Sequence, residues 1–162
     1  MRRFIIAAVL SAAVATGVVA VESPAYAAEP KCDEKVYLET SYDELPAAVP
    51  SYNQTPNGAM CSLAPGDYNN AVAVLQTNLN ECYQRMLAGT EYAFGWLSVD
   101  KEFGPLTKAA LIQVQKYHEI SADGGYGPQT RNAIDWWIGS RSSSPPYWGH
   151  CETLIRPYRF DT

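Results

Sequence analysis

Apolar residues recur at helical spacing along the middle of the chain. Val72, Leu75, Leu79 and Cys82 are three, four and three residues apart, so they fall on one stripe of a helix. Leu75 and Val114 also hold matching positions in two similar hexapeptides, AVAVLQ and ALIQVQ, which indicates equivalent core sites. The predicted helices, which share one small core, span residues 68–83, 105–117 and 128–138.

A segment of fifteen residues occurs twice. Residues 97–111 (LSVDKEFGPLTKAAL) recur 23 positions later as residues 120–134 (ISADGGYGPQTRNAI), with six positions identical. Each copy has an Asp that favours a turn and then Gly-Pro, in which Gly suits a helix cap and Pro suits the first helical position. We therefore expect each copy to form a short extended piece, a turn and a helix.

The repeats and the helix before them resemble a known family. An A-V-x-x-L-Q helix, then D-x-x-F-G-P-x-T and D-G-x-Y-G-P-x-T, make residues 66–138 similar to the peptidoglycan-binding domain 1 family of bacterial cell-wall proteins. The resemblance implies a three-helix module that holds proteins on the wall polymer. The expected fold class is therefore all-α: a small three-helix bundle with irregular N- and C-terminal straps tethered by disulfides.

Two features depart from the family pattern. Lys101 follows Asp100 where the family commonly has Gly, so we expect the first turn to lack the positive φ that glycine accepts readily. The stretch 86–96 is longer than usual and rich in aromatic residues. It is therefore a candidate for specific ligand contacts, with a hydrophobic lid over the core as the alternative.

Residues 1–27 have the features of a secretory signal peptide: a basic start, an apolar run and an A-x-A cleavage pattern. We expect a secreted protein, extracellular or associated with the cell wall, with no membrane segment after cleavage. An uncleaved anchor is the alternative, because the apolar run approaches the length that spans a bilayer. Lipid attachment is disfavoured, since Cys32 follows Glu-Pro-Lys.

The segments 28–65 and 139–162 are rich in Pro, or in Ser and aromatic residues, and have few periodic apolar runs. We expect both to be irregular straps around the domain at residues 66–138. The four cysteines of an exported chain predict two disulfides, for which three pairings are open. The pairing that we favour, because it ties the two straps together, joins Cys61 to Cys82 and Cys32 to Cys151.

Charge and composition argue against several classes of function. The net charge is −5, or −6 without residues 1–27, and basic residues do not cluster, so nucleic acid is not an expected partner. His118 and His150 are the two histidines and no HExxH motif is present, so we expect no metal and no cofactor. His118 is expected to interact with the dipole at a helix C-terminus.

Catalysis is also disfavoured. Cys151 follows His150, a pairing of thiol and imidazole that peptidases use, but an even number of cysteines in an exported chain favours disulfides. Paired carboxylates that cleave glycosides need a cleft, and no stretch outside residues 66–138 could frame one. We therefore expect that the chain is not an enzyme.

A site for peptidoglycan needs aromatic surfaces beside hydrogen-bonding groups, because the polymer exposes apolar sugar faces, acetamido groups, and peptide amides and carboxylates. The candidate contact residues are Tyr92, Trp96, Asp123, Tyr126 and Trp136. The expected function is a secreted, non-catalytic peptidoglycan-binding protein. The alternative is a secreted module that docks on or regulates another extracellular protein, such as a wall hydrolase.

Several of these positions also have structural interpretations. Phe103 and Tyr126 precede Gly-Pro and are expected to pack between turn and helix, which leaves the Tyr126 hydroxyl for a ligand. Asp100 and Asp123 are expected first to accept backbone N–H groups in their turns.

The adjacent Trp136 and Trp137 cannot share one stripe of a helix, because neighbouring helical residues point about 100° apart. Trp137 falls in the register of Leu75 and Val114, so we expect it to be buried. We expect Trp136 to be at least half exposed or covered by the C-terminal tail.

Overall fold

The computed structural model describes residues 29–41, 46–139 and 149–155. The predicted signal peptide, residues 1–27, lies outside this described part of the chain. The elements in chain order are β1 (Glu34–Glu39), β2 (Pro46–Ser51), η1 (Pro56–Ala59), α1 (Asn70–Asn78), η2 (Leu79–Gln84), α2 (Pro105–Tyr117), α3 (Pro128–Ala133), β3 (Trp136–Ile138) and β4 (His150–Glu152). In the part described, no helix is long and apolar enough to cross a membrane.

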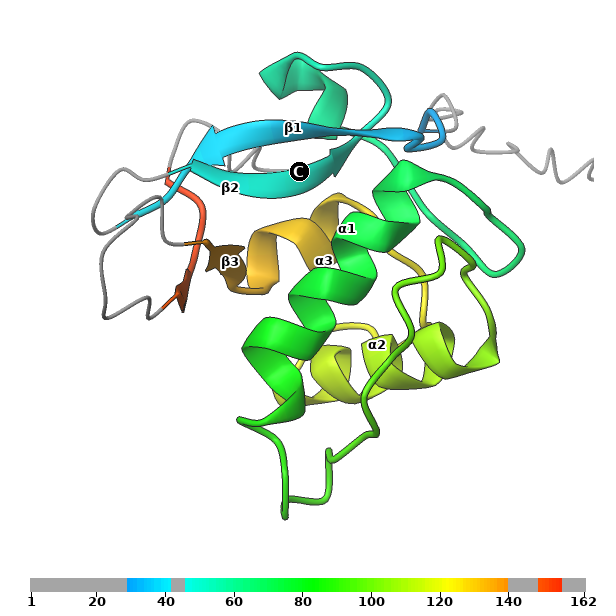
Figure 1. Cartoon of the computed structure of the whole chain (residues 1–162), viewed down its shortest axis with the longest axis vertical. Coiled ribbons are helices and arrows are strands. Elements are labelled where there is room, and N and C mark those ends of the chain that lie inside the picture. The colour runs from blue at the N-terminus through cyan, green and yellow to red at the C-terminus, as the bar shows by residue number, and fades with distance from the viewer. Residues whose placement is uncertain (1–28, 42–45, 140–148, 156–162) are drawn as a thin grey trace, which may run out of the picture.

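The β1–β2 hairpin lies over one side of α1, and α2 lies on the other side of that helix (Figure 1). The second short sheet, formed by β3 and β4, contacts both β2 and η2. One core of buried apolar residues runs through the hairpin, the helices and β3. The helix predicted at 105–117 is confirmed as α2, while the helix predicted at 68–83 begins at Asn70 and continues as the π-helical η2.

The expected all-α fold is wrong, because the described residues combine three α-helices with two antiparallel two-stranded sheets. In β1 the side chains of Val36 and Leu38 are buried and alternate with exposed ones, as in a strand with one covered face. The prolines of β2 suggested an irregular strap. They are tolerated because Pro46 is the first residue of the strand and Pro50 is next to its end.

The third helix also ends earlier than predicted. α3 stops at Ala133, Ile134 is already extended with φ −86° and ψ 155°, and the following residues pair with β4. Alternation along a strand therefore replaces the helical register at the two tryptophans. Trp137 is only half-buried, so its predicted burial is wrong. Trp136 is fully buried rather than half exposed, in a strand that pairs with β4 of the C-terminal tail. The Trp136 indole Nε1–H donates to the carbonyl oxygen of Arg131 at 3.1 Å.

The two predicted disulfides are present, but the favoured pairing is wrong, because the bonds join Cys32 to Cys61 and Cys82 to Cys151. The first bond follows from a local backbone pairing in which the Cys32 N–H donates to the carbonyl oxygen of Ser62 at 3.0 Å. The second follows from β4, which places Cys151 opposite Trp137 and beside η2. Cys82–Cys151 thus fastens the C-terminal strand to the helical body.

Candidate functional site

The first repeat turn is held by a glutamine at the end of the preceding hexapeptide. Gln76 Nε2 donates to Asp100 Oδ1 at 2.8 Å, to the carbonyl oxygen of Glu102 at 3.0 Å and to Thr107 Oγ1 at 3.1 Å. Its Oε1 accepts from the Lys101 N–H at 3.1 Å. One buried side chain of α1 therefore satisfies polar groups of both the turn and α2.

The second repeat turn uses the same arrangement. Gln115 Nε2 donates to Asp123 Oδ1 at 3.0 Å, to the Gly125 carbonyl oxygen at 2.9 Å and to Thr130 Oγ1 at 3.1 Å, and Oε1 accepts from the Gly124 N–H at 2.8 Å. The shared bonds explain why Asp and Thr keep the same spacing in both copies, each pair facing a glutamine of the preceding helix.

The expectation that Lys101 would lack a positive φ is wrong. Lys101 has φ 69°, close to the 73° of Gly124 at the equivalent position. Both backbone N–H groups must point to a glutamine Oε1, so the hydrogen-bond pattern imposes the same left-handed conformation on a residue that disfavours it.

The two turn aspartates accept backbone N–H groups, as expected: Asp100 Oδ1 accepts from Glu102 at 3.0 Å and Asp123 Oδ1 accepts from Gly125 at 2.8 Å. The hydrogen bond from Gln76, followed by that from the Glu102 backbone, lowers the pKa of Asp100 below its usual value. Asp100 therefore stays negatively charged at neutral pH.

Beside the first turn lies a hollow of about 210 Å³, here named the repeat pocket. Its lining consists of Gln76, Trp96, Leu97, Ser98, Asp100, Glu102, Gly104, Pro105, Leu106 and Thr107. Trp96 is 58% exposed and Leu106 is 75% exposed, so both present apolar surface to solvent next to the carboxylates of the turn. An apolar surface beside carboxylates suits a ligand with a flat apolar face and N–H donors.

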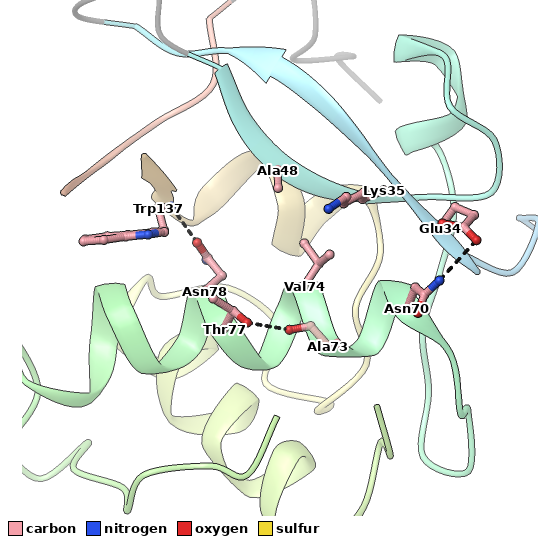
Figure 2. Close-up of a pocket in the computed structure, with 9 residues that line it drawn as sticks. All are labelled: Glu34, Lys35, Ala48, Asn70, Ala73, Val74, Thr77, Asn78 and Trp137. Atoms are coloured by element: carbon pink, nitrogen blue, oxygen red, sulfur yellow. Dashed lines mark hydrogen bonds between the residues drawn. The ribbon is translucent and has the colours of Figure 1, made fainter. Parts of the chain in front are cut away.

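A second hollow, of about 450 Å³, lies between the β1–β2 hairpin and α1 and is here named the hairpin pocket. Figure 2 shows Trp137 at one end of it and Glu34 with Asn70 at the other, with Val74 between them. Its lining consists of Glu34, Lys35, Ala48, Asn70, Ala73, Val74, Thr77, Asn78 and Trp137.

Of the five predicted contact residues, Trp96 is the one that lines the repeat pocket. Tyr126 and Trp136 are 1% and 0% exposed and pack edge to face, so neither presents its ring to a ligand at the surface. Asp123 is exposed but lies in the second turn, and Tyr92 is half-buried against Tyr117. The structure therefore does not bring these five residues to one site.

Two lining groups were missed by the sequence analysis. Leu106 is an exposed leucine directly after the Gly-Pro helix start, and this position could have pointed to it. Trp137 was assigned to the core by a helical register that does not exist, because β3 replaces the end of the predicted helix. The hairpin pocket had no signal of its own, since its β strands were not predicted.

The cysteine and the histidine that were considered for catalysis make structural bonds instead. Cys151 is bonded to Cys82, so it offers no thiol beside His150. His118 lies at the C-cap of α2, as expected, and its Nε2 is 2.8 Å from the Tyr83 hydroxyl. Burial lowers the pKa of His118, which favours a neutral imidazole over the cation expected to meet the helix dipole.

Comparison with known families matches residues 68–134 to the model described as a putative peptidoglycan binding domain. No match was found to a curated protein or to a solved structure. The matched segment begins just before α1 and ends just after α3, and contains both glutamine-held turns. The match supports the assignment of residues 68–134, less than half of the chain, to the peptidoglycan-binding domain 1 family.

Proposed function

We propose that this chain is a secreted, non-catalytic protein that binds peptidoglycan through the repeat pocket. The family match at residues 68–134 supports peptidoglycan as the ligand. The observation that carries the choice of site is the exposure of Trp96 and Leu106 beside the first turn of that matched segment.

The chemistry of the pocket fits the polymer. A sugar ring presents C–H groups on its face, which pack against the Trp96 indole and the Leu106 side chain. The carboxylates of Asp100 and Glu102 then lie where acetamido or peptide N–H groups of the ligand can donate to them. Because Asp100 is held by Gln76, its orientation is fixed before binding, and little conformational entropy is lost.

Export is supported by the two disulfides, which form and persist in oxidising compartments. The signal-like composition of residues 1–27 points the same way. The lack of catalysis is supported by the bonded state of Cys151 and by the structural hydrogen bonds of Asp100, which occupy groups that could otherwise act on a substrate.

The test is co-sedimentation of the purified, oxidised protein with insoluble peptidoglycan. We expect the wild type to be retained, and Trp96→Ala to bind about tenfold more weakly because an exposed aromatic ring at a binding site contributes on this scale. The matched control is Tyr52→Ala, which removes an exposed aromatic residue that lines neither pocket.

Release of soluble wall fragments during the same incubation would contradict the non-catalytic proposal. Failure of the wild type to sediment, together with crosslinking to one extracellular protein, would instead favour the protein-docking alternative.

A further inference from the structure

The hairpin pocket is not explained by the family match. Glu34, Lys35 and Ala48 come from the hairpin and Trp137 from β3, and all of them lie outside residues 68–134. The remaining lining comes from one face of α1. The hollow therefore exists because this chain adds a hairpin and a short strand to the matched domain.

The hollow is elongated along α1. The lining residues of this helix run from Asn70 to Asn78, a distance of about 12 Å along the axis. Trp137 lies at one end of the row and Asn70 at the other, with Ala73 and Val74 between (Figure 2). A ligand that fills it must be extended, with different chemistry at its two ends.

The end at Trp137 is apolar and fixed in place. The Trp137 N–H donates to Asn78 Oδ1 at 2.7 Å, which ties the strand to the end of α1. Directly before β4, a side chain at Gly149 would collide with the Trp137 ring, so the backbone there lies directly against the indole. A half-buried ring held in this way is a rigid surface for a flat apolar group, such as a sugar face.

The other end is polar, and a cation lies between the two ends. Glu34 Oε1 accepts from Asn70 Nδ2 at 3.3 Å, so a carboxylate of the protein is held at the start of the helix. Lys35 is exposed, and Figure 2 shows its ammonium group above Val74, near the middle of the hollow. Its Nζ lies 5.5 Å from the centre of the Tyr37 ring. A carboxylate on the ligand can therefore be bound beside Lys35, away from Glu34.

We propose that the hairpin pocket is a second binding site, and that its ligand is an acetamido sugar that carries a short acidic peptide. This inference rests on the proposed function, because the wall polymer is what supplies such a ligand. The sugar face packs on Trp137, and the peptide follows α1 until its carboxylate meets Lys35. Two extended peptide residues span about 7 Å, close to the distance of about 6 Å along the axis of α1 from Asn78, beside Trp137, to Val74, below Lys35.

A module with two sites can bind one polymer twice. α1 lines both hollows, with Gln76 in the repeat pocket and Thr77 in the hairpin pocket. If one polymer occupies both pockets at once, the apparent affinity for the polymer rises. The affinity for a fragment that fills one pocket does not.

The test uses N-acetylmuramyl-L-alanyl-D-isoglutamine as the probe, titrated into the isotopically labelled, oxidised protein and followed by NMR. We expect chemical-shift changes at the Trp137 indole N–H and at the backbone amides of Ala73 and Thr77. Lys35→Glu should weaken binding at these signals about fivefold, the scale of an exposed ion pair. Lys116→Glu makes the same change of charge on exposed surface outside both pockets and should leave the affinity unchanged.

N-acetylglucosamine provides the second arm, since it has the sugar but no carboxylate. We expect its affinity to be the same in Lys35→Glu and in the wild type. Shifts confined to the repeat pocket, or equal effects of Lys35→Glu and Lys116→Glu, would overturn the inference. If the protein still sediments with peptidoglycan in that case, the hairpin site alone has failed. If the wild type does not sediment, the proposed function has failed with it.

Discussion

At the scale of single residues, the two copies of the repeat are held by the same bonds but differ in one backbone position. Lys101 adopts φ 69° and Gly124 adopts φ 73°, and each donates its N–H to a buried glutamine. A non-glycine residue in the left-handed region is disfavoured by about 1–2 kcal/mol. The first turn is therefore strained in a way that the second is not.

This difference predicts that substitutions at the two positions change the free energy of unfolding in opposite directions. Lys101→Gly should raise the free energy of unfolding by about 0.5–1 kcal/mol, because relief of strain exceeds the added flexibility of the unfolded chain. Gly124→Ala should lower it by more than that, since an added Cβ would come within 2.7 Å of Lys108 Cγ and 2.9 Å of Ile112 Cγ1. Urea unfolding curves measure both changes.

Lys101→Ala is the control for Lys101→Gly, because it removes the same charged side chain and keeps a Cβ. It should leave the stability almost unchanged. A Lys101→Gly protein that unfolds at a lower urea concentration than the wild type would contradict this account of the turn.

At the scale of elements, Tyr83 joins three parts of the fold. Its hydroxyl oxygen accepts from the Asp135 N–H at 2.6 Å, before β3, so its hydrogen points to His118 Nε2 at the end of α2. The imidazole must be unprotonated to accept that hydrogen. Burial lowers the pKa of His118 and, with the neighbouring charge of Asp135, raises the pKa of Tyr83, so the neutral pair is the stable one.

Stability should therefore fall as the pH drops below about 6.5, the unfolded value for histidine. Because the folded pKa of His118 is lowered, the unfolded chain binds more protons in the window between the two values. Thermal unfolding of the wild type and of His118→Gln between about pH 5.5 and 8 isolates this contribution, and the variant should show the flatter profile.

Asp135 affects the pH dependence of stability in the opposite direction, and it does so at more acidic pH. Burial raises its pKa, so its carboxyl group destabilises the fold as the pH rises from the usual value of 3.8 through the raised one. Parallel stability profiles of the two proteins between about pH 5.5 and 8 would contradict the assignment to His118.

The elements also show where sequence reasoning succeeds. α2 was predicted at its observed bounds, because Gly104-Pro105 marks its start and its apolar stripe is local. β3 was missed because the pattern around Trp136 and Trp137 suits a helix or a strand, and only pairing with the distant β4 decides between them. The hairpin was missed for a related reason: Pro46 and Pro50 disfavour a strand locally, while its burial depends on α1.

At the scale of the whole molecule, a matched domain at residues 68–134 is flanked by added segments. Cys82–Cys151 fastens the C-terminal segment to the domain, and Cys32–Cys61 closes a loop within the N-terminal segment. The family resemblance could be predicted, because it depends on short motifs, while Trp96 as a contact residue stays a prediction. The disulfide pairing and the hairpin pocket could not, since they depend on which distant strands meet. The additions give the chain a second hollow that the matched domain alone does not have.

The central claim is that the exposed surface at Trp96 and Leu106 holds the protein on the wall polymer. The most direct measurement is a binding isotherm on insoluble peptidoglycan for the wild type, Trp96→Ala and Tyr52→Ala. The account predicts saturable binding that Trp96→Ala weakens about tenfold and that Tyr52→Ala leaves unchanged. Equal affinity of all three proteins, or no binding by the wild type, would contradict it.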